Sequence, residues 1–577
     1  MQVEQDANQT RKGRGSIPAD GVEWNEEFDV VVVGTGAGGF SSALNAHRLG
    51  ASVVMLEKAP EIGGTTKKTA AWYWIPNNSL LRADGKEDDK RDAVRYMARL
   101  SRPQSYDPND ERLGMTEWEY AAMEAFFDNA STAHDTLVEM GALKPMYAPD
   151  VPDYHSTLPE NKAPYGRTLF PEAPNGEPGK GPEMIRQLSA AAKERGIPSK
   201  TEHRVKAVVV DAEGTVVGVV ASTGGREVAV RARQAVIFAS GGFTHNKELR
   251  QNFLQASIFG GCAAPTNEGD FVDIATALGA PLYNMNYAWM APMPLEISLS
   301  GSPYTSGIFA VPGDSMIFVD KHGRRIVNEK AIYNELTSKF FEFDAAKVEY
   351  PNLLLFMIWD ERTRELWTAT EAIEDTTPSR LALDNYGNVI YEDSHIIEGE
   401  TIEDLARNIR TRLEGLASHT GGFRLDDGFA REVPKTIARF NELARTGKDT
   451  DFGRGENPIE HTFNGEAKPD NGTGNATMYP MSEEGPYYAT IVVAGALDTK
   501  GGPRTTTDGQ ILGVTGEPVS GLYGVGNCVA SASAQGYWAG GGTLGPILTF
   551  GYLAAEHAAR QPKREVATRA AREETSV

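Results

Sequence analysis

Residues 28–57, FDVVVVGTGAGGFSSALNAHRLGASVVMLE, contain the pattern that decides the fold. A run of apolar residues leads into GTGAGG at residues 34–39, a helix pattern of small residues follows, and a second apolar segment ends at Glu57. This order is the fingerprint of a βαβ unit that binds a dinucleotide: a strand, the G-x-G-x-x-G turn, a helix, a second strand and an acid. Backbone N–H groups at the helix start hold the pyrophosphate, and the acid accepts a ribose hydroxyl. The pattern alone permits NAD, NADP or FAD.

Composition and charge describe a globular chain that is long enough for more than one domain. Of its 577 residues, 40% are hydrophobic and 24% are charged, and the formal net charge is −22. This acidity argues against a nucleic-acid partner, because phosphate binding needs a basic surface. The two cysteines, Cys262 and Cys528, have neither metal-ligand nor disulfide spacing. We therefore expect a reducing compartment and no metal site.

Targeting signals are missing from the sequence. Residues 1–21 lack the apolar core of a signal peptide. No window approaches the roughly 18 apolar residues that a membrane helix needs. We expect a cytoplasmic protein without a transmembrane segment, and peripheral association with a membrane stays open as an alternative.

Three separated segments are expected to build one Rossmann-like α/β domain over residues 27–285 and 487–562. After the opening unit, residues 202–210, 216–221 and 227–230 predict a β-meander, and residues 234–238 predict a buried parallel strand of the same sheet. Residues 521–527 supply a last short strand, and a glycine-rich turn opens a helix over residues 547–559. Residues 181–195 predict another helix, and residues 114–142 an amphipathic helix pair.

An inserted block over residues 286–486 differs in composition from the flanking segments, because it is richer in charged and turn residues. Helical patterns at 404–416 and 434–443 indicate an inserted α+β cap domain. Flexible tails are expected at residues 1–26 and 563–577.

Six segments spread over most of the chain share one family pattern: VVVGTGAGGFSSALNA, GGTTKKTAAWYWIPNN, FASGGFTHN, HGRRIVNE, GALDTKGG and GLYGVGN. Together they resemble the flavoprotein family that contains fumarate reductases and 3-ketosteroid dehydrogenases. The resemblance implies a two-dinucleotide-binding-domain flavoprotein with FAD and a mobile cap that holds substrate against the flavin. It implies cofactor contacts from Gly34, Gly36, Ala37, Gly38, Gly39, Glu57, Lys58, Gly64, Thr65, Thr66, Val205, Ser240, Gly241, Gly242, Asn527, Gly542, Thr543 and Leu544.

The way the flavin is held also follows from the resemblance. Residues 63–66, GGTT, lack the histidine to which succinate dehydrogenases attach flavin, so non-covalent FAD is expected. Since the chain shows no second dinucleotide motif, direct use of NAD(P) is not expected. A quinone, oxygen or a carrier protein could accept the electrons.

Two chemistries compete within this family, and individual residues favour one of them. Fumarate reductases place a proton-donating arginine soon after the N-E of the cap motif, where this chain has Tyr333. Residues 488–495 also lack a histidine for a carboxylate. The ketosteroid-dehydrogenase pattern fits instead, with Tyr333 in the cap and Tyr537 followed four residues later by Gly541. The closest resemblance is therefore to enzymes that desaturate cyclic ketones.

That resemblance implies a role for each of four residues. Dehydrogenation beside a ketone removes a proton from the α-carbon and a hydride from the β-carbon, while charge grows on the carbonyl oxygen. Tyr537 O–H and Gly541 N–H are the expected donors to that oxygen, and Tyr333 is the expected base. An ordinary tyrosine has a pKa of about 10, so Tyr333 needs stabilisation of its anion. Tyr154 is expected to share its proton, and FAD N5 to take the hydride.

The substrate and the direction of reaction stay open at this stage. Trp538-Ala539 stand where the steroid enzymes tend to have Pro-Gly, and we expect this change to alter the substrate wall. The bulk of Trp538 and Trp289 favours a small cyclohexanone-like ring over a steroid. The alternatives are a reductase that acts on an enone or enoate, and a redox-silent FAD-binding protein. The combination of Tyr333, Tyr537 and Gly541 argues against a silent protein.

Overall fold

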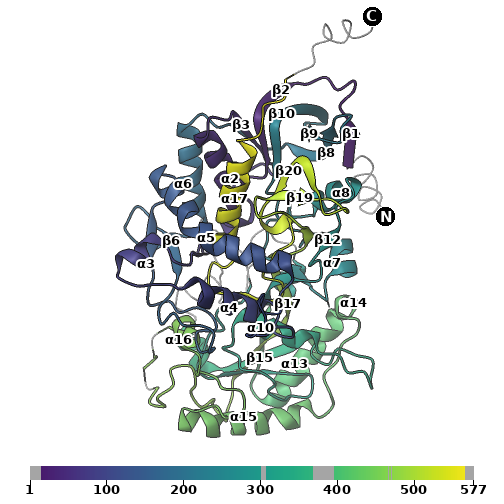
Figure 1. Cartoon of the computed structure of the whole chain (residues 1–577). Coiled ribbons are helices and arrows are strands. Elements are labelled where there is room, and N and C mark those ends of the chain that lie inside the picture. Colours follow the sequence, from purple (N-terminus) through teal and green to yellow (C-terminus); the bar gives the residue numbers. More distant parts are fainter. Residues whose placement is uncertain are drawn as a thin grey trace, which may run out of the picture.

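A computed structural model of the chain describes residues 15–255, 257–300, 307–367, 395–465, 467–469 and 471–565. Two large sheets organise these residues, one in the upper and one in the lower half of Figure 1. In the part of the chain that is described, no helix has the length and apolarity to cross a bilayer.

The first sheet has nine strands in the order β1-β8-β9-β10-β2-β3-β7, with β20 pairing on β10 and β19 on β20. The strands are β1 (Gly15–Pro18), β2 (Glu26–Val33), β3 (Val53–Leu56), β7 (Ser199–Lys200), β8 (Arg204–Val210), β9 (Val216–Thr223), β10 (Arg226–Phe238), β19 (Gln510–Leu512) and β20 (Pro518–Gly524). β2, β3, β10 and β20 are mutually parallel, as the opening βαβ pattern predicts.

Strand β10 joins the two parts of this sheet. Its first half pairs antiparallel with β9, which completes the predicted meander, and its second half pairs parallel with β2 and β20. The sequence suggested two separate strands here. The structure has one continuous strand whose register shifts between Ala232 and Ala235.

Helices cover the first sheet through small residues. α2 (Ala37–Arg48) and α17 (Leu544–Ala558) lie side by side (Figure 1), and Ser41 Oγ donates a 2.7 Å hydrogen bond to the Leu548 carbonyl. A Cβ on Gly551 would lie 2.9 Å from the Cβ of Ser41, so glycine is needed for this close packing. α6 (Gly181–Glu194) forms as predicted.

The segment expected to form a helix pair is one helix, α5 (Glu117–Glu139). Thr116 and Glu119 form a reciprocal capping box at its start, which fixes where the helix begins. No turn residue interrupts the apolar spacing that follows, so the helix continues for 23 residues. The prediction of a pair is therefore wrong.

The second sheet belongs to the cap. Its six strands are β11 (Gly260–Gly261), β13 (Ala288–Pro294), β14 (Met316–Val319), β15 (Leu355–Asp360), β16 (Ile397–Gly399) and β17 (Tyr487–Thr499). α13 (Ile402–Gly415) and α15 (Phe429–Thr446) pack on it through Leu405, Ile409, Phe429 and Phe440. β17 pairs with β11, β13, β15 and β16, so residues 487–499 belong to the cap sheet and not to the first domain as predicted.

Both expected tails include residues that pair with the first domain, so their predicted bounds are wrong. β1 pairs in parallel with β8, which places residues 15–18 in the first sheet. At the other end, Arg564 N donates to Arg233 O at 2.9 Å, and Lys563 Nζ lies 3.0 Å from Asp29 Oδ2. Residues 1–14 and 566–577 lie outside the described residues.

Candidate active site and cofactor pocket

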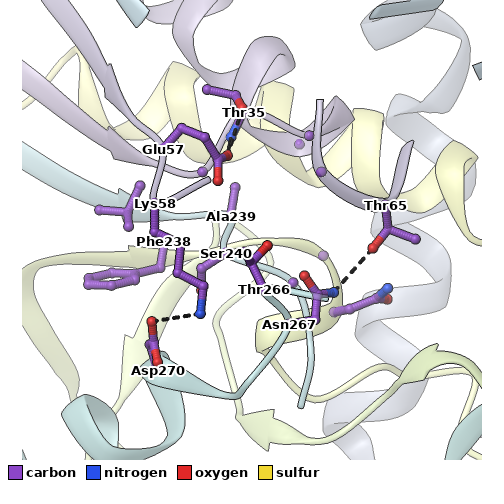
Figure 2. A pocket seen from close by; sticks show the side chains of 18 of the residues that line it. Thr35, Glu57, Lys58, Thr65, Phe238, Ala239, Ser240, Thr266, Asn267 and Asp270 are labelled. Carbon is purple, nitrogen blue, oxygen red and sulfur yellow. Dashed lines mark hydrogen bonds and ion pairs between the residues drawn. The ribbon is translucent and has the colours of Figure 1, made fainter. Parts of the chain in front are cut away.

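A deep pocket lies at the ends of β2, β3 and β10, and we call it the cofactor pocket (Figure 2). Most of the predicted contacts line it: Gly34, Gly36, Ala37, Gly38, Glu57, Lys58, Gly64, Thr65, Thr66, Val205, Ser240, Gly241 and Asn527. Parallel strands end at the same edge of a sheet, so segments distant in sequence meet there.

The start of α2 suits a phosphate group. Gly36 is the N-cap residue and has no side chain that could cap the helix, so the first turn has N–H groups beyond that of Ala37 to present to the pocket. The Ala37 N–H donates to Thr66 Oγ1 at 3.0 Å, which brings the predicted GGTT segment to the same place. At Gly34, with φ +108°, a Cβ would lie 2.4 Å from the Ala239 carbonyl oxygen. Glycine is therefore required at position 34 for the close approach of the ends of β2 and β10.

Glu57 is held by donors from its own domain. Its Oε2 accepts from the Thr35 N–H and hydroxyl at 3.1 and 2.7 Å (Figure 2). Its Oε1 accepts from the Ala59 N–H at 2.9 Å. Oε1 retains acceptor capacity for a ribose hydroxyl. Lys58 pairs with Asp270 at 3.0 Å on the pocket wall.

Four predicted cofactor residues do not line this pocket, and a fifth lies in another cavity. A Cβ on Gly39 would lie 2.0 Å from the Gly34 oxygen, so Gly39 serves the turn itself. The Gly242 N–H donates to Asp498 at 3.0 Å. Gly542 and Leu544 lie at the start of α17, and Thr543 lines a second cavity described below. Their cofactor contacts stay a prediction.

Asp498 is the main pocket residue that sequence reasoning did not single out, although its motif GALDTKGG was noted. It lies near the end of β17 and accepts from the Gly242 N–H, from the Thr244 hydroxyl at 2.8 Å, from Asn267 at 2.7 Å and from Asn527 at 3.1 Å. Burial raises its pKa. An acid at the end of a strand of buried apolar residues is the signal that could have identified it. Asp498 joins the cap sheet to the cofactor pocket.

Three tyrosines from distant parts of the chain meet beside this junction, and we call them the tyrosine cluster. The hydroxyl oxygens of Tyr154 and Tyr333 lie 2.5 Å apart, and the Tyr537 ring centroid lies 5.3 and 5.5 Å from theirs. All three are buried. Tyr333 is the first residue of α10 (Tyr333–Thr337), and Tyr537 precedes α17. The structure thus brings together the three predicted catalytic tyrosines; their roles stay predictions.

Buried ion pairs hold the segments that carry Tyr154 and Tyr333. Arg167 pairs with Asp153, the residue before Tyr154, and with Asp88, and Asp153 also accepts from Trp74 Nε1. Burial raises the pKa of Asp153. Sequence reasoning identified neither Asp88 nor Arg167.

A second buried pair lies in the cap motif. Glu329 lies four residues before Tyr333. It accepts hydrogen bonds from Arg325 at 2.7 Å and from Arg454 at 3.2 Å. Arg325 also pairs with Asp449, so it is engaged within the cap rather than with a substrate.

The tyrosine cluster does not supply the anion stabilisation expected for Tyr333. Burial raises the pKa of Tyr154 and Tyr333 well above the ordinary tyrosine value, and it also raises that of Tyr537. Glu335 adds to the rise at Tyr154 through its negative charge. The two hydroxyls share one hydrogen bond across their 2.5 Å contact, in which either oxygen can be the donor.

The hydrogen bonds around Tyr537 and Gly541 bear on their predicted role as donors, which stays a prediction. The Thr543 hydroxyl donates to the Tyr537 oxygen at 3.1 Å, so the Tyr537 proton is available to another acceptor. Among the hydrogen bonds of the described residues, none comes from the Gly541 N–H. Gly541 has φ +90°, and a Cβ there would lie 2.5 Å from the Tyr73 nitrogen. Packing against residues 72–73 thus requires glycine, beyond the substrate access that we expected.

The two tryptophans used to predict substrate size lie in different surroundings. Trp289, on β13, contacts Tyr537 edge-on at 4.9 Å and donates to Asn527 at 3.0 Å. Trp538 stacks on Phe126 and donates to Ser101 at 3.1 Å. The Trp538 ring therefore packs against α5, and its expected effect on the substrate wall stays a prediction.

Comparison with known proteins identifies the family. The sequence pattern of the FAD binding domain family matches residues 29–544. The chain belongs to this family. The cofactor of this FAD binding domain protein is FAD, and the prediction of an FAD-dependent oxidoreductase is confirmed.

Among its relatives, 4-oxocyclohexanecarboxylate 2-dehydrogenase of Sinomonas cyclohexanicum is 31% identical, over 92% of this chain and 93% of the relative. A 3-oxosteroid 1-dehydrogenase of Mycobacterium tuberculosis is 30% identical, over 93% of this chain and 99% of the relative. The crystal structure of 3-ketosteroid Δ1-dehydrogenase from Sterolibacterium denitrificans, in complex with 1,4-androstadiene-3,17-dione, matches with a TM-score of 0.74 and 24% identity, over 93% of this chain and all of that one. The predicted fold class is confirmed.

Proposed function

We propose that this FAD-dependent oxidoreductase desaturates a cyclic ketone between its α- and β-carbons. The observation that carries the proposal is the 2.5 Å contact of Tyr154 and Tyr333 beside Tyr537 and the Gly541 N–H, which has no partner among the described residues. The two relatives described above act, by their names, on a ring ketone and on 3-oxosteroids. A six-membered ring with a ketone is common to both substrate classes.

Each residue has one task in this reaction. Tyr333 takes the α-proton, and Tyr154 shares that proton through their short contact. Tyr537, whose oxygen already accepts from Thr543, donates its proton toward the ketone oxygen together with the Gly541 N–H. Fixed donors of this kind stabilise the charge that grows on the oxygen. When bound, FAD supplies the acceptor for the hydride that leaves the β-carbon.

The fumarate-reductase alternative has less support. Dicarboxylate binding needs uncommitted cations, whereas Arg167, Arg325 and Arg454 are all engaged in buried ion pairs. Lys500, which lies over the Trp289 ring, donates to the carbonyls of Ala534 and Gly536. A neutral ketone suits these surroundings better than a dianion.

Three further features belong to the proposal. FAD is held non-covalently, so acid precipitation of the protein should leave the yellow colour in the supernatant. The cap is mobile relative to the first domain. The protein acts in the cytoplasm, in agreement with the buried free thiols of Cys262 and Cys528.

The test is anaerobic mixing of the purified yellow protein with cyclohexanone, 4-oxocyclohexanecarboxylate or a 3-ketosteroid. We expect one of these ketones to bleach the flavin absorbance and to yield an enone with two hydrogens fewer. If none bleaches the protein while reduced dye plus fumarate reoxidises it, the proposal is wrong.

A further inference from the structure

A second cavity of about 630 Å³ lies beside the cofactor pocket, and we call it the α5 cavity. It is bounded by the first half of α5, by residues 504–507 and by residues 524–532 before α17. Thr116, Glu117, Thr507 and Gly516 at its rim are exposed, whereas Phe126, Val525 and Trp538 in its interior are buried. The α5 cavity therefore runs from solvent into the first domain.

The α5 cavity and the cofactor pocket share a wall. Val525, Gly526, Asn527 and Ile547 line both. Trp289, which donates to Asn527 and contacts Tyr537, lines only the α5 cavity, and no tyrosine of the cluster lines it. A molecule in the α5 cavity would therefore lie beside the cofactor pocket, and Trp289 and Thr543 would stand between it and the tyrosine cluster.

The lining of the α5 cavity suits a flat ring that carries carbonyl oxygens. Trp118, Phe126, Trp538 and Phe550 provide aromatic walls. Arg504 lies over Trp118 at 5.0 Å, and its buried Nε has no hydrogen-bond partner among the described residues. A buried donor without a partner is uncommon and suits an acceptor atom of a ligand.

We propose that the α5 cavity binds a quinone that accepts the electrons removed from the ketone. The inference rests on the proposed desaturase function, which requires an oxidant. Overall, the ketone loses a proton and a hydride and becomes an enone. The quinone gains two electrons and two protons and becomes a hydroquinone. The ketone is then oxidised at the tyrosine cluster and the quinone is reduced in the α5 cavity, and the same FAD serves both reactions.

The test compares two matched tryptophan substitutions on α5 in the FAD-loaded enzyme. Ala121 lines the α5 cavity and Ala125, one turn later, does not, although both are half-buried. Equilibrium dialysis with 2-methyl-1,4-naphthoquinone measures binding directly. We expect Ala121→Trp to weaken binding at least tenfold, Ala125→Trp to leave it unchanged, and neither to slow anaerobic bleaching by the ketone.

A second variant tests the donor without filling the α5 cavity. Arg504→Gln should weaken quinone binding severalfold and leave ketone bleaching unchanged, which keeps the test valid if Ala121→Trp does not fold. The proposal is overturned if the wild-type enzyme binds no quinone, if Ala121→Trp and Arg504→Gln bind it normally, or if they slow bleaching as much as they weaken quinone binding. Quinone binding without bleaching by any ketone would instead reject the desaturase function.

Discussion

The hydroxyl oxygens of Tyr154 and Tyr333 lie 2.5 Å apart, although the two residues are separated by 179 positions in the sequence. Tyr154 follows Asp153 of the Arg167 ion pair, and Tyr333 begins α10 after the buried Glu329. Each tyrosine is thus held by a buried network of its own domain. The contact joins a segment of the first domain to α10, so under the proposed function it would make proton transfer depend on how the cap lies on the first domain.

Tyr333→Phe removes the proposed base and keeps the ring packing. We expect the rate of anaerobic ketone bleaching to fall by about 100- to 10,000-fold, the usual contribution of a positioned base. FAD content, measured by absorbance, should stay normal. Ile332→Val, at the neighbouring buried position, is the control for packing changes. A near-normal rate in Tyr333→Phe would remove the base role.

Tyr537→Phe removes one donor to the ketone oxygen. The expected loss in bleaching rate is about 100- to 1,000-fold, as for single oxyanion donors elsewhere. Thr543→Val deletes the hydroxyl that donates to the Tyr537 oxygen, and it should cause a smaller loss because the Tyr537 proton remains. Stopped-flow absorbance separates the two variants. Equal losses would show that Tyr537 acts only through Thr543.

The bleaching rate should rise with pH. Tyr333 acts as a base in its ionised form, and burial raises its pKa well above the ordinary value. Below that pKa, the ionised fraction grows about tenfold per pH unit, so the rate at low ketone concentration should rise steadily from pH 7 to 9. Tyr333→Phe should flatten this profile. A plateau below pH 8 in the wild-type enzyme would contradict the assignment.

The free energy of unfolding should fall at high pH, whereas the bleaching rate rises with pH. The fold favours the neutral forms of Tyr154, Tyr333 and Tyr537, since each has a raised pKa. Their contribution is complete below the unfolded tyrosine pKa of about 10 and is lost as the pH rises further. Urea unfolding midpoints of the wild-type enzyme should therefore fall more steeply above pH 10 than those of Tyr333→Phe.

Arg167→Met leaves two buried carboxylates, Asp88 and Asp153, without their cation. Removing one partner of a buried ion pair typically destabilises a protein by about 3–5 kcal/mol. We expect a loss of this size in the free energy of unfolding, measured with urea. Arg439→Met removes an exposed ion pair with Asp451 and should have no comparable effect. Unchanged stability in Arg167→Met would mean that the carboxylates are neutral without it.

Sequence reasoning succeeded where chemistry is encoded locally. The GTGAGG turn, Glu57 and the GGTT segment were predicted to meet a dinucleotide, and they line one pocket because parallel strands end together. Sequence reasoning failed where pairing between distant strands decides which sheet a strand joins. Strand β17 follows the cap in sequence with the same apolar texture as a strand of the first domain, and only its pairing with β13 and β15 assigns it to the cap.

The tryptophans show the same limit at single residues. Trp538 and Trp289 were both placed near the substrate, yet Trp538 turns toward Phe126 while Trp289 contacts Tyr537. Side-chain direction in a turn depends on what packs around it, and sequence spacing carries no such information outside regular helices and strands.

By itself, the sequence determined the cofactor class and the opening βαβ unit, because each rests on short motifs whose geometry is local. The roles of Tyr154, Tyr333 and Tyr537 stay predictions from a family resemblance. The tertiary structure decided that Tyr154 and Tyr333 share a 2.5 Å contact, that Asp498 joins cap and cofactor pocket, and that a second cavity reaches the same pocket. Those features depend on packing between segments hundreds of residues apart, where burial and the pairing of charges fix the arrangement.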